Sequence, residues 1–154
     1  MSSNPSPFHV APAVTPFFGA RYEPDGSIGL GCLSQWWQAP FFEQGHRFQT
    51  AEHFMMWCKA IIFGDAEVAR QILQTQSPKE AKALGRKVAG FDADVWDAHS
   101  QAVVLAGNMA KFTHHPELAE VLLDTGDTLL VEASPYDRIW GAGIAADDPR
   151  IHDT

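Results

Sequence analysis

Glu52 is the residue whose type and position first suggest chemistry. It falls at the second position of an expected helix that begins after Thr50, and Met55 or Met56 and then Lys59 follow at i+3 or i+4 and at i+7. Residues at this spacing share one helix face, so the carboxylate and the ammonium stand about two turns, or roughly 10 Å, apart. Such a pair can flank a bound phosphoribosyl group. The alternatives are that Glu52 only interacts with the helix dipole and that Lys59 is a solvated surface lysine.

A second set of reactive side chains comes near the end of the chain. Asp137, Arg138 and Trp140 follow an apolar segment, residues 128–133, and a Ser-Pro turn. Together they supply a group for proton transfer or charge stabilisation, a fork for phosphate and a stacking surface. The alternative is an Asp–Arg surface pair beside a core tryptophan, and spacing alone does not decide between the two.

Five further residues are open to two interpretations. Trp96 lies on a long expected helix, where a tryptophan is more often part of the core than a platform for a ligand. Asn108 and Lys111 follow on the same helix and can reach a ligand or face solvent. Lys82 and Arg86, on another expected helix, can point to the site or to water.

Composition limits the classes of function. The chain has 154 residues and a formal net charge of −8, which suits a single domain with an acidic surface. An acidic surface argues against general nucleic-acid binding, although a local pocket can still be basic. The sequence contains no dinucleotide fingerprint, P-loop or zinc motif. We therefore expect no cofactor and no metal.

The location of the protein is also suggested by what the sequence contains. Cys32 and Cys58 are its only cysteines, and we expect them to be free thiols in a reducing compartment. Residues 1–16 do not resemble a signal peptide, and no segment reaches the roughly 18 apolar residues of a spanning helix. These features favour a cytoplasmic protein without a membrane partner.

Local start and stop signals predict an α+β fold that is mainly helical. Thr50, Asp65 and Ser77 are expected N-caps, Asp92 or Asp94 opens a longer helix, and Pro116 begins a last one. Residues 17–22 and 128–133 are expected strands. We expect a flexible leader over residues 1–16, then one domain over 17–154, with several helices packed around a small sheet of N- and C-terminal strands. The first three helices are expected to cover residues 51–63, 66–74 and 78–88, and the last to close near residue 126.

Several short segments, in order, resemble the NADAR superfamily. Each is short, but their order over about residues 17–148 resembles the branch of N-glycosidases that act on riboflavin-biosynthesis intermediates. The matching segments are Leu33–Trp36, Ala39–Phe41, Phe48–Phe54, Lys59–Ala60, Phe63–Asp65, Ser77–Val88, Phe91–Asp92, Val95–Asp97, Lys111–Phe112, Pro116–Leu118, Leu123–Gly126, Leu130–Ser134 and Asp137–Gly141.

The resemblance implies an enzyme that hydrolyses a ribosyl C–N bond of an early riboflavin-pathway aminopyrimidine and releases ribose 5-phosphate. It places the family's glutamate at Glu52, its aspartate at Asp137, and its tryptophans at Trp96 and Trp140. Glu52 is then expected to act on the sugar or on the attacking water, and Asp137 to act as a second carboxylate or proton relay. The candidates for phosphate binding are Arg138, Lys59 and Arg21.

Two departures from the family pattern carry expectations of their own. Gln35 stands where the family often has Asn. The family commonly continues through a W-x-G-x-N-x-L-G segment, which has no match before Thr154. Since the resemblance implies that this segment forms a wall of the family's pocket, the alternatives are that this sequence is shortened and that this member of the family is.

Two other functions remain open. One is removal of ADP-ribose from modified guanine, for which a basic rim around the site would be the indication. The other is a module that binds NAD or ADP-ribose without turnover, which ligand binding without product would indicate. In all three cases the expected partner is a small-molecule ribosyl compound, with nucleic acid involved only as an ADP-ribosylated substrate.

Overall fold

The computed structural model describes residues 13–17 and 19–132. They divide into two compact units, of which one is the continuous stretch Gly19–Val121 and the other contains the first and last strands. The described elements, in chain order, are β1 (Val14–Phe17), a 3₁₀ helix (Leu30–Leu33), β2 (Phe41–Glu43), β3 (His46–Phe48), α1 (Ala51–Ile62), α2 (Ala66–Gln74), α3 (Pro78–Gly85), α4 (Ala93–His114), α5 (Pro116–Asp124) and β4 (Leu129–Glu132).

The helices begin where their caps predict. The side chains of Thr50, Asp65, Ser77 and Asp92 each accept a hydrogen bond from a main-chain N–H two or three residues further on, which satisfies a donor that the first turn leaves open. The expected bounds of α1 and α2 are confirmed. The expected end of α3 is wrong, because this helix stops at Gly85 and not near residue 88.

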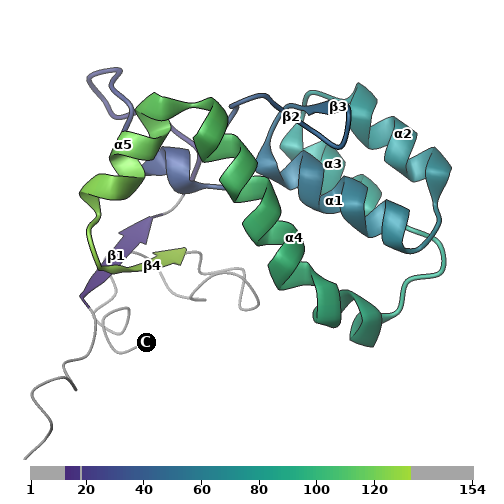
Figure 1. Ribbon diagram of the computed structural model, residues 1–154. Coiled ribbons are helices and arrows are strands. Elements are labelled where there is room, and N and C mark those ends of the chain that lie inside the picture. The colour runs from purple at the N-terminus through teal and green to yellow at the C-terminus, as the bar shows by residue number, and fades with distance from the viewer. Residues whose placement is uncertain (1–12, 18, 133–154) are drawn as a thin grey trace, which may run out of the picture. The chain divides into compact units, whose positions relative to one another are not determined.

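Helix α1 lies at the centre of the Gly19–Val121 unit. It packs against α2, α3 and α4, which surround it in Figure 1. On one side Met55, Met56 and Ala60 join a core cluster that includes Ile72 and Trp96. Burial of these apolar side chains stabilises the unit and fixes the face of α1 that carries Glu52.

A short antiparallel hairpin, β2–β3, leads into α1. Phe41 pairs with Phe48 across it, and both rings are almost completely buried with Phe54 of α1. The connecting residues Gln44 and Gly45 have φ values of 52° and 76°, as a two-residue turn of this kind requires.

The second unit contains a parallel pair of strands. Val14–Phe17 runs alongside Leu129–Glu132, and the hydroxyl groups of Thr15 and Thr128 are hydrogen-bonded. Pairing of an N-terminal with a C-terminal strand confirms the expected α+β class. The first strand was expected over residues 17–22, which is wrong: it begins at Val14, inside the expected leader, whose residues 1–12 lie outside the described structure.

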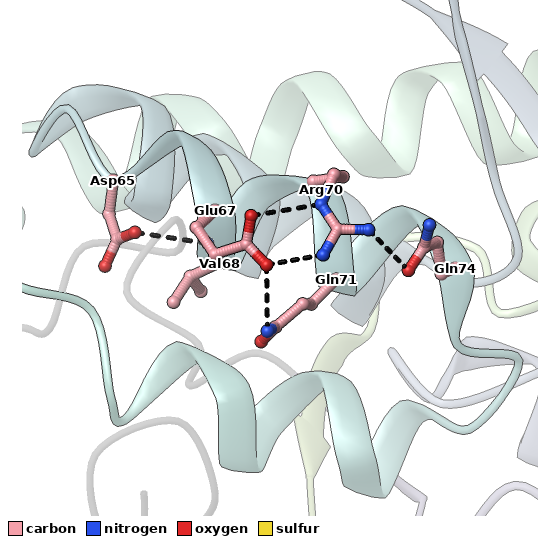
Figure 2. A network of polar contacts seen from close by, with 6 residues as sticks. All are labelled: Asp65, Glu67, Val68, Arg70, Gln71 and Gln74. Atoms are coloured by element: carbon pink, nitrogen blue, oxygen red, sulfur yellow. Dashed lines mark hydrogen bonds and ion pairs between the residues drawn. The ribbon is translucent and has the colours of Figure 1, made fainter.

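The exposed side of α2 carries a polar network (Figure 2). Glu67 accepts hydrogen bonds from Arg70 and Gln71, and Arg70 donates to Gln74. Asp65 caps the helix at Val68. Ion pairs at such exposed positions stabilise a protein by at most about 1 kcal/mol, so we regard this face as a solvated surface. None of the described helices is both long and apolar enough to cross a membrane.

Candidate active site

Glu52 occupies the second position of α1, as predicted. Its side chain is only 7% exposed, and its main-chain N–H donates to the carbonyl oxygen of Gln35 at 3.0 Å. The N-terminal end of a helix carries partial positive charge, which favours a carboxylate there. A buried carboxylate held at a defined helix end is suited to chemistry as well as to stability.

Lys59 responds to the charge of Glu52. Burial lowers the pKa of Lys59, while the Glu52 carboxylate acts in the opposite direction and the Arg86 guanidinium lowers it further. Its Nζ lies 4.5 Å from the ring centroid of Phe91 and 6.0 Å from that of Trp96, distances at which an ammonium is attracted to an aromatic face. The predicted shared face of α1 thus brings a carboxylate and an ammonium into electrostatic contact.

Helix α3 and its C-cap contribute two cations, Lys82 and Arg86, and the sequence alone did not show whether they point to the site or to water. Gly85 allows α3 to approach α1 closely, because a Cβ atom at this position would lie 2.1 Å from the Sδ atom of Met56. The next residue, Arg86, is near enough to Lys59 to influence its pKa. One turn earlier, the Nζ atom of Lys82 lies 6.0 Å from the ring centroid of Trp36. Both cations are therefore near residues of the α1 face or of the loop that holds it.

Trp96 belongs to the core. It is 8% exposed and clusters with Met55 and Met56, which agrees with the more common role of a helical tryptophan. The same ring also faces the Lys59 ammonium. Its proposed contact with a substrate stays a prediction.

Asn108 and Arg21 have surroundings that the sequence did not indicate. The Asn108 amide donates to the carbonyl oxygen of Val104, one turn earlier in α4, at 3.0 Å. Arg21 is exposed, and its main chain runs so close to Gly31 that a Cβ atom there would lie 2.3 Å from the Arg21 carbonyl oxygen. Asn108 is thus engaged by its own helix, and the expected contacts of both residues with a ligand stay predictions.

The remaining site residues predicted from the sequence are Asp137, Arg138 and Trp140, which lie outside the described residues.

Lys111 neither faces solvent nor is free to reach a ligand, which were the two alternatives considered from the sequence. It is fully buried, and its Nζ donates to the carbonyl oxygens of Cys32 at 2.6 Å and Ser34 at 2.9 Å. Sequence reasoning missed this arrangement because the acceptors lie 79 and 77 residues earlier in the chain. No local pattern connects such distant positions.

A small pocket lies on another side of α1. It has a volume of about 110 Å³ and is lined by polar and apolar residues of β3 and α2, together with His53 but not Glu52. Because neighbouring residues of a helix point in different directions, this pocket and the Glu52–Lys59 face are separate features. We place the candidate active site at the Glu52–Lys59 face.

Comparison with known proteins identifies the family to which the chain belongs. The NADAR domain model matches residues 22–154. N-glycosidase R617 of Acanthamoeba polyphaga mimivirus is 40% identical over 135 residues, which cover 84% of this chain and 78% of the relative. The chloroplastic riboflavin biosynthesis protein PYRR of Zea mays is 36% identical over 102 residues, covering 61% of this chain but 16% of that protein.

A solved structure has the same fold. The NMR structure of YbiA from E. coli aligns with a TM-score of 0.71 and 24% identity, covering 94% of this chain and 81% of that one. A structural match at this level of identity shows the fold alone. Membership in a family is shown by the domain model and by the mimivirus relative. The chain therefore belongs to the NADAR domain family.

Proposed function

We propose that the protein is an N-glycosidase that hydrolyses the C–N bond of a phosphoribosylated aminopyrimidine from the early riboflavin pathway and releases ribose 5-phosphate. The observation that carries this proposal is the buried Glu52 carboxylate, placed at the start of α1 and within electrostatic reach of Lys59. The names of two relatives support it, because one is called an N-glycosidase and another a riboflavin biosynthesis protein.

The proposed chemistry uses Glu52 where positive charge develops. As the bond from C1′ to nitrogen breaks, positive charge builds on C1′ and on the ring oxygen, and a nearby carboxylate stabilises it or orients the attacking water. Water adds its oxygen to C1′, and the departing nitrogen gains a proton. Asp137 serves as the second carboxylate or as the proton relay.

The cations around the face are suited to the substrate's phosphate. Lys59 is half-buried and lies near Arg86, and Lys82 stands beside Trp36. Guanidinium and ammonium groups bind phosphate oxygens through charge-assisted hydrogen bonds. We propose that these α1 and α3 cations act with Arg138 and Arg21.

The predicted aromatic and amide side chains contact other parts of the substrate in this proposal. In this proposal, Trp96 and Trp140 form walls for the base and the sugar, and Asn108 offers a polar contact from α4.

Glu52→Gln tests the proposal directly. The change keeps the shape of the side chain but removes its charge, so we expect the release of ribose 5-phosphate from the aminopyrimidine ribosylamine phosphate to fall by about 100-fold or more. Glu120→Gln, at an exposed position of α5, is the matched control and should retain full activity. Circular dichroism establishes that all three proteins are folded. A folded Glu52→Gln variant with native activity would contradict the proposal.

A second candidate has one observation in its favour. Lys82, Arg86 and the exposed Lys87 place three cations near the end of α3, which is the kind of basic rim that a diphosphate-bearing substrate would use. This candidate removes ADP-ribose from modified guanine. Incubation with an ADP-ribosylated guanine oligonucleotide distinguishes the two, because release of ADP-ribose without release of ribose 5-phosphate would favour it. Binding of ADP-ribose without turnover of either substrate would indicate a binding module.

A further inference from the structure

Lys111 is a buried ammonium held by main-chain carbonyls. The side chain comes from the last turns of α4 and has no exposed surface. Its two acceptors, the carbonyl oxygens of Cys32 and Ser34, belong to the segment at the end of the 3₁₀ helix. A single side chain of α4 thus holds two nearly adjacent points of a loop.

The burial of this charge is costly. Burial lowers the pKa of Lys111 to about 8, with a smaller opposing influence from Cys32. Moving an ammonium out of water is unfavourable even after the protein relaxes, and an apolar residue of similar volume often makes a protein equally or more stable. Filling space therefore does not explain a lysine here, whereas its hydrogen-bond donors to the two carbonyls do.

The segment that Lys111 holds leads directly to Glu52. Gln35 follows Ser34, and its carbonyl oxygen accepts the main-chain N–H of Glu52 at 3.0 Å. A donor in the first turn of a helix has no acceptor inside that helix, so Gln35 supplies the partner that α1 itself lacks. The next residue, Trp36, stands beside Lys82. Lys111, the segment Cys32–Gln35 and Glu52 thus form a continuous chain of contacts.

We propose that Lys111 is a positioning residue: it fixes the segment Cys32–Gln35, and through the Gln35 carbonyl it sets the orientation of Glu52. The catalytic part of this inference rests on the proposed N-glycosidase function. Lys111 itself does not touch the substrate, because its side chain has no exposed surface. Its effect on the reaction passes through the start of α1.

Amide hydrogen exchange measures this clamp without any assay of activity. In Lys111→Met, which keeps the length but removes the donors, we expect the exchange of the Glu52 amide to accelerate by about tenfold or more, while amides in the middle of α1, such as that of Met56, keep their protection. Lys79→Met, at an exposed position of α3, is the control and should leave both unchanged. Uniform loss of protection along α1, or unchanged exchange at Glu52, would overturn the proposal.

Kinetics then test the consequence for catalysis. A misplaced catalytic group costs about 10- to 100-fold in rate, so we expect kcat of Lys111→Met to fall by this factor, with KM within about twofold of the native value. Lys111→Gln retains N–H donors and should recover part of kcat and of the Glu52 protection, and it decides the matter if the Met variant does not fold. A fall in kcat that Gln does not lessen would contradict a positioning role.

The two proposals fail separately. If the native chain releases no ribose 5-phosphate, the proposed function is wrong, and the exchange of the Glu52 amide still decides whether Lys111 fixes Glu52. If the native chain is active but Lys111→Met retains its kcat, the positioning role is wrong and the proposed function stands.

Discussion

The imidazole of His53 donates from Nε2 to the carbonyl oxygen of Thr75 across 2.9 Å and so joins the first turn of α1 to the residue that ends α2. Because that acceptor is a carbonyl, Nε2 carries the proton, and Nδ1 accepts from the Thr50 hydroxyl at 2.7 Å. The neutral ring is therefore fully satisfied. A second proton would displace the Thr50 donor from Nδ1.

This arrangement predicts a loss of stability in mild acid. Burial lowers the pKa of His53, whereas the unfolded chain has a histidine pKa of about 6.5. Between these two values the unfolded state binds more protons, so the free energy of unfolding rises with pH. The contribution is complete above about pH 6.5 and is lost as the pH falls through the folded-state pKa. Urea unfolding at a series of pH values measures it.

Two histidine variants isolate the effect. His53→Gln should reduce the slope of stability against pH in this window, while His99→Gln, at an exposed position of α4, should retain it. Equal slopes in the two variants would show that another group is responsible.

The pKa of Lys59 should move in opposite directions in two variants. Glu52 raises this pKa and Arg86 lowers it, so Glu52→Gln should lower the pKa of Lys59 and Arg86→Gln should raise it. NMR titration of the Lys59 side chain provides the measurement, and Arg70→Gln, on the exposed face of α2, provides the control. Shifts of the same sign in the first two variants would mean that the three charges are not arranged as described.

Gly85→Ala tests how closely α3 approaches α1. The added Cβ would lie 2.1 Å from the Met56 Sδ atom, and Met56 is only 6% exposed. Overpacking of a core costs about 1–3 kcal/mol, so we expect a lower Tm. The same change in a Met56→Ala background should cost clearly less, because the clashing atoms are gone. Equal costs in both backgrounds would argue against this contact.

The sequence predicts those parts of the fold that depend on neighbouring residues. The N-caps Thr50, Asp65 and Ser77 act on N–H groups three residues away, which is why the beginnings of α1, α2 and α3 could be predicted. The end of α3 could not be predicted in this way. The helix ends at Gly85, Arg86 is its C-cap, and the residues from there to Gly90 mostly form turns, although the local stop signal is Gly90.

The first strand was misplaced for a different reason. β1 contains Pro16, a residue that lacks an N–H group and that local rules assign to loops or strand edges. It is a strand because Leu129–Glu132 pairs with it, and this partner is far away in the sequence.

The candidate site also contains some features that local sequence predicts and others that depend on distant residues. The shared face of Glu52 and Lys59 follows from helical spacing and is visible in the sequence. The approach of Arg86 depends on the packing of α3 at Gly85, and the carbonyl partners of Lys111 lie 79 and 77 residues earlier in the chain. A sequence read in short windows contains neither relationship.

The pairing of β1 with β4 sets an order of events during synthesis on the ribosome. Thr15 and Thr128, whose hydroxyl groups meet beside this pair, are 113 residues apart, so the N-terminal strand is made long before its partner leaves the exit tunnel. The continuous unit Gly19–Val121 can assemble in the meantime, since domains generally fold as units while the chain emerges. Among the described elements, the β1–β4 pair can form only after residues 129–132 have been made.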